Sequence, residues 1–440
     1  MNHSLAPTVV LLLVCGAAVA DAQSQSGRPY KALFGGATND PTVQQSLDVT
    51  ASVSEGYDDN VLADLGASSA AGPAFSGVYT ALVPAMNYDW VGHAVQISAT
   101  ASSSFKYFQP EHQFIGTSHF GAVGLSAGSQ ATRFSFNQSF SYSPAYYYGL
   151  FPTLTTASDV GYVVGADSDY AVGAKPILAY DTSANFSQRL SARSTVTAVG
   201  TFLYSDLSRV PNSRNLSSYS AGGRYAYGLS RYANVHFGYV YREGQYYYAA
   251  GSQPAVSHDI DIGVDYHKPL SFSRRTHFDF SVGSSLLNTP SFDLVQTHGF
   301  QYVVLGNASL THDIARTWRA RLVYDRGIGF VQGLAGPVVS DAVKTSVDGF
   351  LSRRMDMHVT AGFQDGNVGN AHQPRSSVRS YSGSARLQFA LDRTWALFSE
   401  YTYYSYTLGA AVIGTGGIPQ ALDRNNVRVG LTVWAPLVRK

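Results

Sequence analysis

One pattern repeats from Leu47 to Val433: a run of alternating apolar and polar residues, followed by a turn. In the clearest copy, Asn426–Val433, every second residue is aliphatic. Because successive side chains of a strand point to opposite faces, each run predicts a strand with one apolar and one polar face. No helical period interrupts the series. A single sheet of this kind needs lipid against its apolar face and closure to satisfy its edges, which predicts an all-β transmembrane antiparallel barrel.

The composition agrees with a membrane barrel and excludes a helical membrane protein. Charged residues make up 13% of the 440 residues, well below the roughly 25% of soluble domains. Beyond the N-terminus, no apolar run approaches the about 20 residues that a spanning helix requires. The formal net charge of +1 gives no reason to expect a nucleic-acid partner. No shift in composition divides the chain into domains.

The first residues predict export. The short apolar stretch Val9–Val14 precedes Ala20-Asp21-Ala22, which has the small-residue spacing of a signal-peptide cleavage site. We expect a signal peptide at 1–22, a flexible periplasmic tail at 23–45 and a bacterial outer-membrane barrel at 46–435. Cleavage would remove Cys15, the only cysteine, and with it disulfides and thiol chemistry. A lipid anchor at Cys15 is the alternative, although Val14 is bulkier than the residue such signals prefer.

Counting the alternating runs gives eighteen candidate strands. Sixteen is the main alternative, because bacterial barrels have even strand counts. The runs begin near Leu47, Ser76, His93, Thr117, Ala131, Ala174, Arg193, Leu216, Tyr232, Ser257, Thr276, Gly299, Thr317, Asp341, Met357, Ser377, Trp395 and Arg424.

The connections between the runs alternate between short and long. Outer-membrane barrels place short turns on the periplasmic side and long loops outside. The longest connection, Ser143–Gly173, carries Asp159, Asp167 and Asp169. We predict that it is a constriction loop folded into the barrel, and an outward excursion is the alternative.

The tryptophans gather at one predicted edge of the membrane. Trp90, Trp318, Trp395 and Trp434 all lie near short turns or at the end of the last strand. Aromatic residues are typical of the membrane–water interface of barrels. The four tryptophans therefore predict a membrane girdle, and packing in a protein core is the alternative interpretation.

The alternation also selects charged residues that point into the barrel. The predicted pore-lining residues are Asp259, Asp261, Asp265, Asp279, Arg319, Arg321, Arg386 and Arg428. The carboxylates and the arginines come from different strands, so they could oppose one another across the lumen and orient polar solutes. Ordinary ion pairing that fills and rigidifies the interior explains the same residues equally well.

Two segments resemble a known family. Glu55-Gly56-Tyr57-Asp58-Asp59-Asn60-Val61 is similar to the YDDN-type first strand of a family of outer-membrane β-barrel porins, some of which accompany exopolysaccharide gene sets. The segment Arg424–Trp434 is similar to the last strand of the same group. The resemblance implies a porin-like barrel and covers the two ends of the chain. Such barrels usually end on an aromatic residue, whereas this chain continues from Trp434 through Ala435–Lys440.

The sequence offers no catalytic centre. G-x-S-x-G, H-E-x-x-H and P-loop patterns are absent. The histidines follow no ligand spacing, and Asp58, Asp59, Asn60 and Asp64 predict a solvated turn rather than a calcium site. We therefore expect no enzyme activity, no metal and no cofactor.

The function expected from these features is passive diffusion of small hydrophilic solutes, including saccharides, through an outer-membrane channel. An accessory barrel of an exopolysaccharide export system is the alternative. A barrel hydrolase is a third reading, without an identifiable nucleophile–base pair. The expected partners are outer-membrane lipid and lipopolysaccharide, the barrel insertion machinery, and small polar solutes or polysaccharide, with no nucleic acid.

Overall fold

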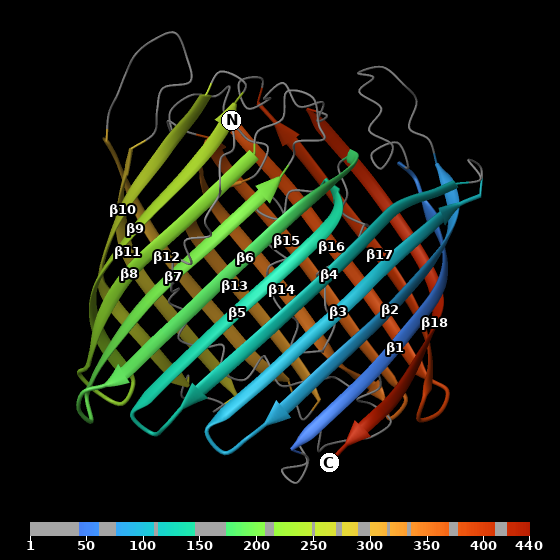
Figure 1. Ribbon diagram of the computed structural model, residues 1–440, viewed down its shortest axis with the longest axis horizontal. Coiled ribbons are helices and arrows are strands. Elements are labelled where there is room, and N and C mark those ends of the chain that lie inside the picture. The colour runs from blue at the N-terminus through green and yellow to red at the C-terminus, as the bar shows by residue number, and fades with distance from the viewer. Residues whose placement is uncertain are drawn as a thin grey trace, which may run out of the picture.

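A computed structural model of the chain contains eighteen β-strands in one sheet (Figure 1). The structure describes residues 44–60, 76–109, 113–145, 173–206, 215–248, 251–269, 275–288, 300–314, 317–331, 336–368, 377–409 and 420–440. The predicted signal peptide and nearly all of the predicted periplasmic tail lie outside these residues. No helix within the described ranges is long and apolar enough to cross a membrane.

The strands follow the alternating runs of the sequence. They are β1 (Gln45–Asp58), β2 (Gly77–Val91), β3 (Val95–Phe108), β4 (Gln113–Gly128), β5 (Thr132–Ala145), β6 (Gly173–Arg189), β7 (Ser194–Asp206), β8 (Asn215–Gly228), β9 (Ala233–Tyr248), β10 (Gly251–Pro269), β11 (Thr276–Asn288), β12 (Phe300–Ile314), β13 (Trp318–Gly329), β14 (Val338–Ser352), β15 (Met355–Val368), β16 (Ser377–Ala390), β17 (Trp395–Leu408) and β18 (Ala421–Arg439).

Each strand pairs antiparallel with its neighbours in sequence, and β1 also pairs with β18. This last pairing closes the sheet into a barrel, so the fold prediction is confirmed with eighteen strands rather than sixteen. The connections from each even-numbered strand to the next are short and lie at one end of the barrel, together with the C-terminus (Figure 1). At this end the backbone N–H of Gln45 donates to the carbonyl of Lys440 at 2.9 Å. The other end carries the long connections, and also the short ones from β3 to β4 and from β9 to β10. We refer to the two ends as the short-turn end and the long-loop end.

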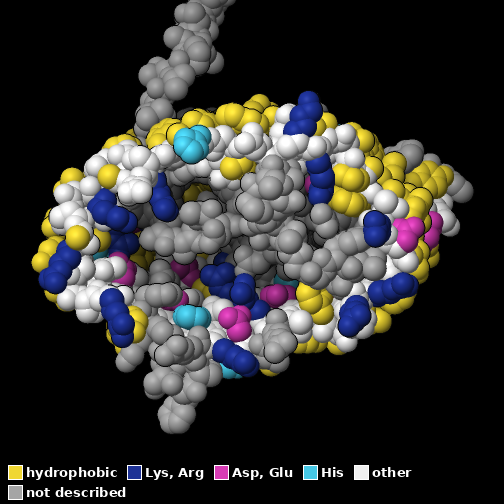
Figure 2. All heavy atoms as spheres, turned by 90° about the horizontal axis from the view of Figure 1, so that it is seen from below, with side chains coloured by type: hydrophobic (Ala, Val, Ile, Leu, Met, Phe, Trp, Pro, Cys, Tyr) yellow, Lys and Arg dark blue, Asp and Glu magenta, His cyan; other side chains and the backbone are white. Residues whose placement is uncertain are grey.

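Alternation places the apolar residues of each strand on the outside of the barrel. On β10, Ile260 and Ile262 are exposed, while Asp259 is buried. On β18, Val427 is exposed and Arg428 is buried. Hydrophobic side chains accordingly dominate the outer rim of the barrel, and several charged side chains lie within it (Figure 2). The exposed apolar face is the one that lipid would cover.

A row of outward charges on β13–β16 marks the edge of the apolar surface towards the long-loop end. Arg326, Asp341, Asp365 and Arg379 lie opposite one another on successive strands. Arg326 Nη1 is 2.6 Å from Asp341 Oδ2, and Arg379 Nε is 2.9 Å from Asp365 Oδ1. A lipid-facing Arg costs about 2–4 kcal/mol at the bilayer midplane and little at the interface. The row therefore belongs at headgroup level.

The last strand is longer than the sequence predicts. The predicted barrel ends at residue 435, whereas β18 continues to Arg439. The additional residues pair with the start of β1, with Val438 opposite Leu47 and Pro436 opposite Asp48. The register shifts between Leu47 and Asp48. Such a bulge accommodates Pro436, which has no N–H to donate to the ladder.

Candidate functional site

The barrel interior borders solvent about halfway along its wall. Asp181 on β6, Asn307 on β12, and Arg321 and Asp325 on β13 are inward-facing positions, and all four residues are exposed. An inward side chain of a closed barrel reaches solvent only through the interior. Barrels of 16–18 strands are wide enough for an aqueous channel. The interior is therefore the candidate site for solute passage.

The carboxylate of Asp265 on β10 contacts two basic side chains, one on β9 and one on β8. Asp265 Oδ2 is 2.6 Å from Arg224 Nη2 on β8 and 3.1 Å from His236 Nδ1 on β9. The His236 side chain is fully buried. A carboxylate that accepts hydrogen bonds from two cationic side chains is held in one orientation. This arrangement fixes Asp265 against the wall.

Asp259 is held in a similar way nearer the long-loop end. Its Oδ2 is 2.7 Å from Arg242 Nε on β9. Its Oδ1 accepts hydrogen bonds from Ser257, at 3.2 Å, and from Ser285 on β11. Asp279 accepts a longer bond of 3.4 Å from Ser309. The side chain of Asp261 lies outside the described residues.

A row of six charged side chains and one histidine crosses the inner wall from β12 to β18, and the signs of the charges mostly alternate. Each member lies directly opposite the next on the neighbouring strand. We call this row the charge belt; its members are Asp313, Arg319, Asp348, His358, Arg386, Glu400 and Arg428. Opposite charges placed directly across a strand pair each stabilise a sheet by about 0.2–1 kcal/mol.

Glu400 is the carboxylate shared by two arginines of the charge belt. Its Oε2 is 3.2 Å from Arg386 Nη1 and 3.0 Å from Arg428 Nη2. At the other end of the belt, Arg319 Nε is 2.9 Å from Asp313 Oδ1. Three of the predicted arginines thus lie beside carboxylates of this row, whereas Arg321 lies opposite Thr311 and Ser346.

These contacts change the expected electrostatics of the lumen. The sequence leaves open whether the two groups of charges oppose one another or form local ion pairs. Asp259 and Asp265 each contact an arginine, and Arg386 and Arg428 share Glu400. Opposite charges about 3 Å apart largely cancel at the distance of a passing solute. Local pairing thus weakens the field of Asp259 and Asp265, while Arg386, Arg428 and Glu400 together keep one net positive charge.

The chain enters the barrel interior at the end of β13. Phe330 packs against a cluster on the inner wall of β7–β10, formed by Leu203, Leu216, Tyr246 and Ala255. Arg242 Nη1 on β9 donates to the carbonyl of Ile328 at 3.4 Å. Since β9 and β13 are not neighbours, the segment Ile328–Phe330 reaches across part of the interior. It narrows the lumen between these strands.

This narrowing is not the one that the sequence predicts. The predicted constriction loop, with Asp159, Asp167 and Asp169, lies outside the described residues. Nothing in the alternating pattern indicates that the chain between β13 and β14 enters the barrel. In the structure both described ends of that connection are buried, at Val331 and at Gly336–Pro337.

The wall formed by β3–β7 differs from the charged wall. Its inward positions are mostly short, uncharged polar residues; those on β3, β5 and β6 include Ser98, Thr100, Ser102, Ser135, Asn137, Ser139, Ser183 and Asn185. Among the described residues in the middle of this wall, Asp181 is the charged exception. Short side chains leave more open cross-section beside this wall than beside the arginines and tyrosines opposite.

Three tryptophans lie on the lipid-facing side of their strands. Trp395 is 40% exposed and points the same way as the exposed Leu397. Trp90 and Trp318 occupy the outward positions of β2 and β13. All three lie at the short-turn end. Their role in a membrane girdle stays a prediction.

Trp434 does not belong with the other three, and the girdle prediction is wrong for this residue. Trp434 is only 6% exposed and packs against Ala390 and Ala396. It lies an even number of residues from Arg428, so it points into the barrel. The even spacing from Arg428 is the sequence signal for this inward position. Proximity to the membrane edge alone does not show which face of the strand carries the side chain.

Other interior residues were also missed. Arg224, His236 and Arg242 bind the predicted aspartates, and Glu400 binds the predicted arginines. All occupy inward positions of their own strands, so the alternation marks them as candidates. Their pairing depends on the register between strands, which the sequence does not display.

Comparison with known proteins finds similarity only to solved structures, and at low identity. No protein-family model and no curated protein matches the sequence. Among solved structures, Pseudomonas aeruginosa OpdL is similar at 11% identity and a TM-score of 0.41, over 90% of this chain and 99% of that one. Acinetobacter baumannii OccAB4 is similar at 9% identity and a TM-score of 0.43, over 91% and 100%. P. aeruginosa OprD is similar at 10% identity and a TM-score of 0.40, over 96% and 98%.

Proposed function

We propose that this protein is a bacterial outer-membrane channel through which small hydrophilic solutes diffuse passively. The observation that supports this most directly is the set of exposed polar side chains halfway along the inner wall, including Asp181 and Arg321. A closed barrel with an apolar exterior and a water-accessible interior provides a path for polar solutes and needs no chemical step.

Size is the expected basis of selection. Ile328–Phe330 narrows the lumen on the charged side, and short polar side chains leave room along β3–β7. Locally paired charges hinder the passage of neutral solutes less than a strong electric field across the lumen would. Small neutral saccharides fit these requirements. No described residue favours the alternative role in exopolysaccharide export.

Liposome swelling tests this proposal. Liposomes containing the folded protein are placed in iso-osmotic solutions of neutral sugars of increasing size. We expect swelling rates that fall steadily with solute size and do not saturate with concentration. The control is the same protein unfolded by heat before reconstitution. Rates equal to this control, with folded protein verified in the liposomes, would refute a passive channel.

A further inference from the structure

The segment Asp58–Asn60 lies at the long-loop end of the seam where the first and last strands meet. The sequence predicts a solvated turn here, which is wrong for Asp58, because this residue is completely buried. Its carboxylate binds Arg424 of β18, with both oxygens 2.9 Å from Arg424 Nε and a further bond from Nη2. Both side chains have 0% exposure. A buried pair of this kind depends on both partners, because either one alone would be an uncompensated charge.

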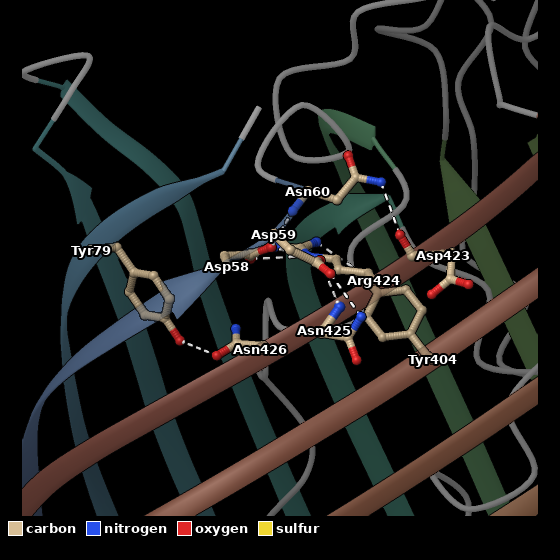
Figure 3. A network of polar contacts seen from close by, with 9 residues as sticks. All are labelled: Asp58, Asp59, Asn60, Tyr79, Tyr404, Asp423, Arg424, Asn425 and Asn426. Atoms are coloured by element: carbon tan, nitrogen blue, oxygen red, sulfur yellow. Dashed lines mark hydrogen bonds and ion pairs between the residues drawn. The ribbon is translucent and has the colours of Figure 1, made fainter. Parts of the chain in front are cut away.

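The next two residues bind neighbouring positions of the same strand (Figure 3). Asp59 Oδ1 accepts from the backbone N–H of Asn425 at 2.7 Å, and Asp59 Oδ2 accepts from Asn425 Nδ2 at 2.7 Å. Asn60 Nδ2 donates to the carbonyl of Asp423 at 3.0 Å. Three consecutive residues of one segment thus bind three consecutive residues of the other.

Two further strands join this network. On β2, the Tyr79 hydroxyl donates to Asn426 Oδ1 at 2.7 Å. On β17, the Tyr404 hydroxyl accepts from Arg424 Nη1 at 2.8 Å. Gly56 provides the room for Tyr79, because a Cβ at that position would overlap the phenol ring. The strands on both sides of the seam are therefore tied together at one point.

The β1–β18 pair needs side chains that fix its register more than any other strand pair does. Every other pair joins strands that are adjacent in the chain, whereas Asp58 and Arg424 are 366 positions apart. Backbone ladder bonds form in many registers, and a slip of two residues keeps each side chain on its own face. Side chains must therefore select the register.

We infer that residues 58–60 and 423–426 form a clasp that sets the register between β1 and β18 and holds the barrel closed. A slip of two residues would separate Asp59 from Asn425 and Tyr79 from Asn426 at once. The clasp thus gives a structural role to both segments whose sequence resembles the ends of other outer-membrane barrels.

Cysteine cross-linking reads out the register. The hydroxyls of Ser52 and Thr432 are 2.9 Å apart, so the pair Ser52→Cys and Thr432→Cys reports the native register. Ser54 lies opposite Gly430, so Ser54→Cys with Thr432→Cys reports a two-residue slip. Diagonal positions of this kind are about 7–8 Å apart, too far for a disulfide without backbone movement.

Each reporter pair is combined with Asp58→Asn plus Arg424→Gln, or with the milder Asp59→Ala. We expect both clasp variants to lose native cross-linking and to gain slipped cross-linking severalfold. We also expect them to unfold at a lower temperature, seen as the sample temperature at which the gel mobility of the folded protein is lost. The matched control is Asp365→Asn plus Arg379→Gln, an exposed pair between sequence neighbours β15 and β16. If the double clasp variant does not fold, cross-linking in Asp59→Ala tests the inference. Parent-like cross-linking in Asp59→Ala, with melting no lower than the control, would overturn the inference.

Discussion

The ring of Phe330 lies against the backbone of Gly244, where any larger residue would overlap it. Phe330 directly follows β13, and Gly244 is an inward position of β9. Contact between strands that are not neighbours is possible only through the interior. This contact narrows the lumen between β9 and the end of β13.

Removing the Phe330 ring should widen the channel. We expect Phe330→Ala to raise single-channel conductance, because the ring fills space between β9 and β13. Gly244→Val should displace the ring and change the conductance as well. Phe389→Ala is the matched control, because Phe389 is 37% exposed on the outer face. Equal conductance in Phe330→Ala and Phe389→Ala would show that the narrowing lies elsewhere.

Neutralising the paired aspartates should favour anions. Asp259→Asn with Asp265→Asn leaves Arg242 and Arg224 without their carboxylate partners. One unit charge acts on an ion about 10 Å away in water with only about 0.4 kcal/mol, so two freed arginines should change ion preference severalfold at most. Reversal potentials in a salt gradient measure this. No shift, with conductance intact, would place these residues off the conducting path.

The reverse change is expected for the charge belt. Arg386→Gln with Arg428→Gln leaves Glu400 as an unpaired carboxylate, which should shift reversal potentials towards cations. Adding Glu400→Gln to this variant removes that negative charge and should return the reversal potential about halfway to the parent value. A triple variant that remains as cation-selective as the double variant would disprove the role given to Glu400.

The two faces of β11 should respond differently to a lysine. Val282 is 47% exposed at the middle of the strand, and its neighbour Ser281 points inward. Val282→Lys should lower the free energy of unfolding by about 2–4 kcal/mol, since the charge would lie in lipid. Ser281→Lys should change it far less. Denaturant titration of the protein folded into bilayers compares them; similar losses would mean that the face assignment of β11 is incorrect.

The tryptophans offer a test of the inner and outer faces. In single-tryptophan variants, we expect lipids with brominated chains to quench Trp395 fluorescence strongly and Trp434 fluorescence weakly. Trp395 is 40% exposed on the outside, whereas Trp434 packs between Ala390 and Ala396. Strong quenching of Trp434 would contradict its inward position.

Much of the fold could be predicted because alternation is a local property. The predicted strand starts at Thr276, Ser377 and Trp395 coincide with those of the structure, and Ser257 differs most, because β10 begins at Gly251. The start of β10 contains Pro254 and small residues, which weaken the alternating pattern. The end of β18 was missed for a different reason: Pro436 suggests a stop unless its partner strand and the bulge are known.

The candidate site could be predicted only in part. The alternation identifies which residues point inward, such as Asp265 and Arg428. It does not show that Asp265 meets Arg224, or that Arg424 meets Asp58, because those contacts depend on register and on closure of the barrel. The inward position of Phe330 is equally non-local, because its ring contacts a glycine on another strand.

The most direct test of the account is electrical recording from the parent protein in planar bilayers. An aqueous channel of this kind predicts stepwise current increases, a nearly linear relation between current and voltage, and only weak ion selectivity. Folding is verified beforehand by the different gel mobility of heated and unheated samples. Folded protein that inserts without producing conductance steps would contradict the channel function.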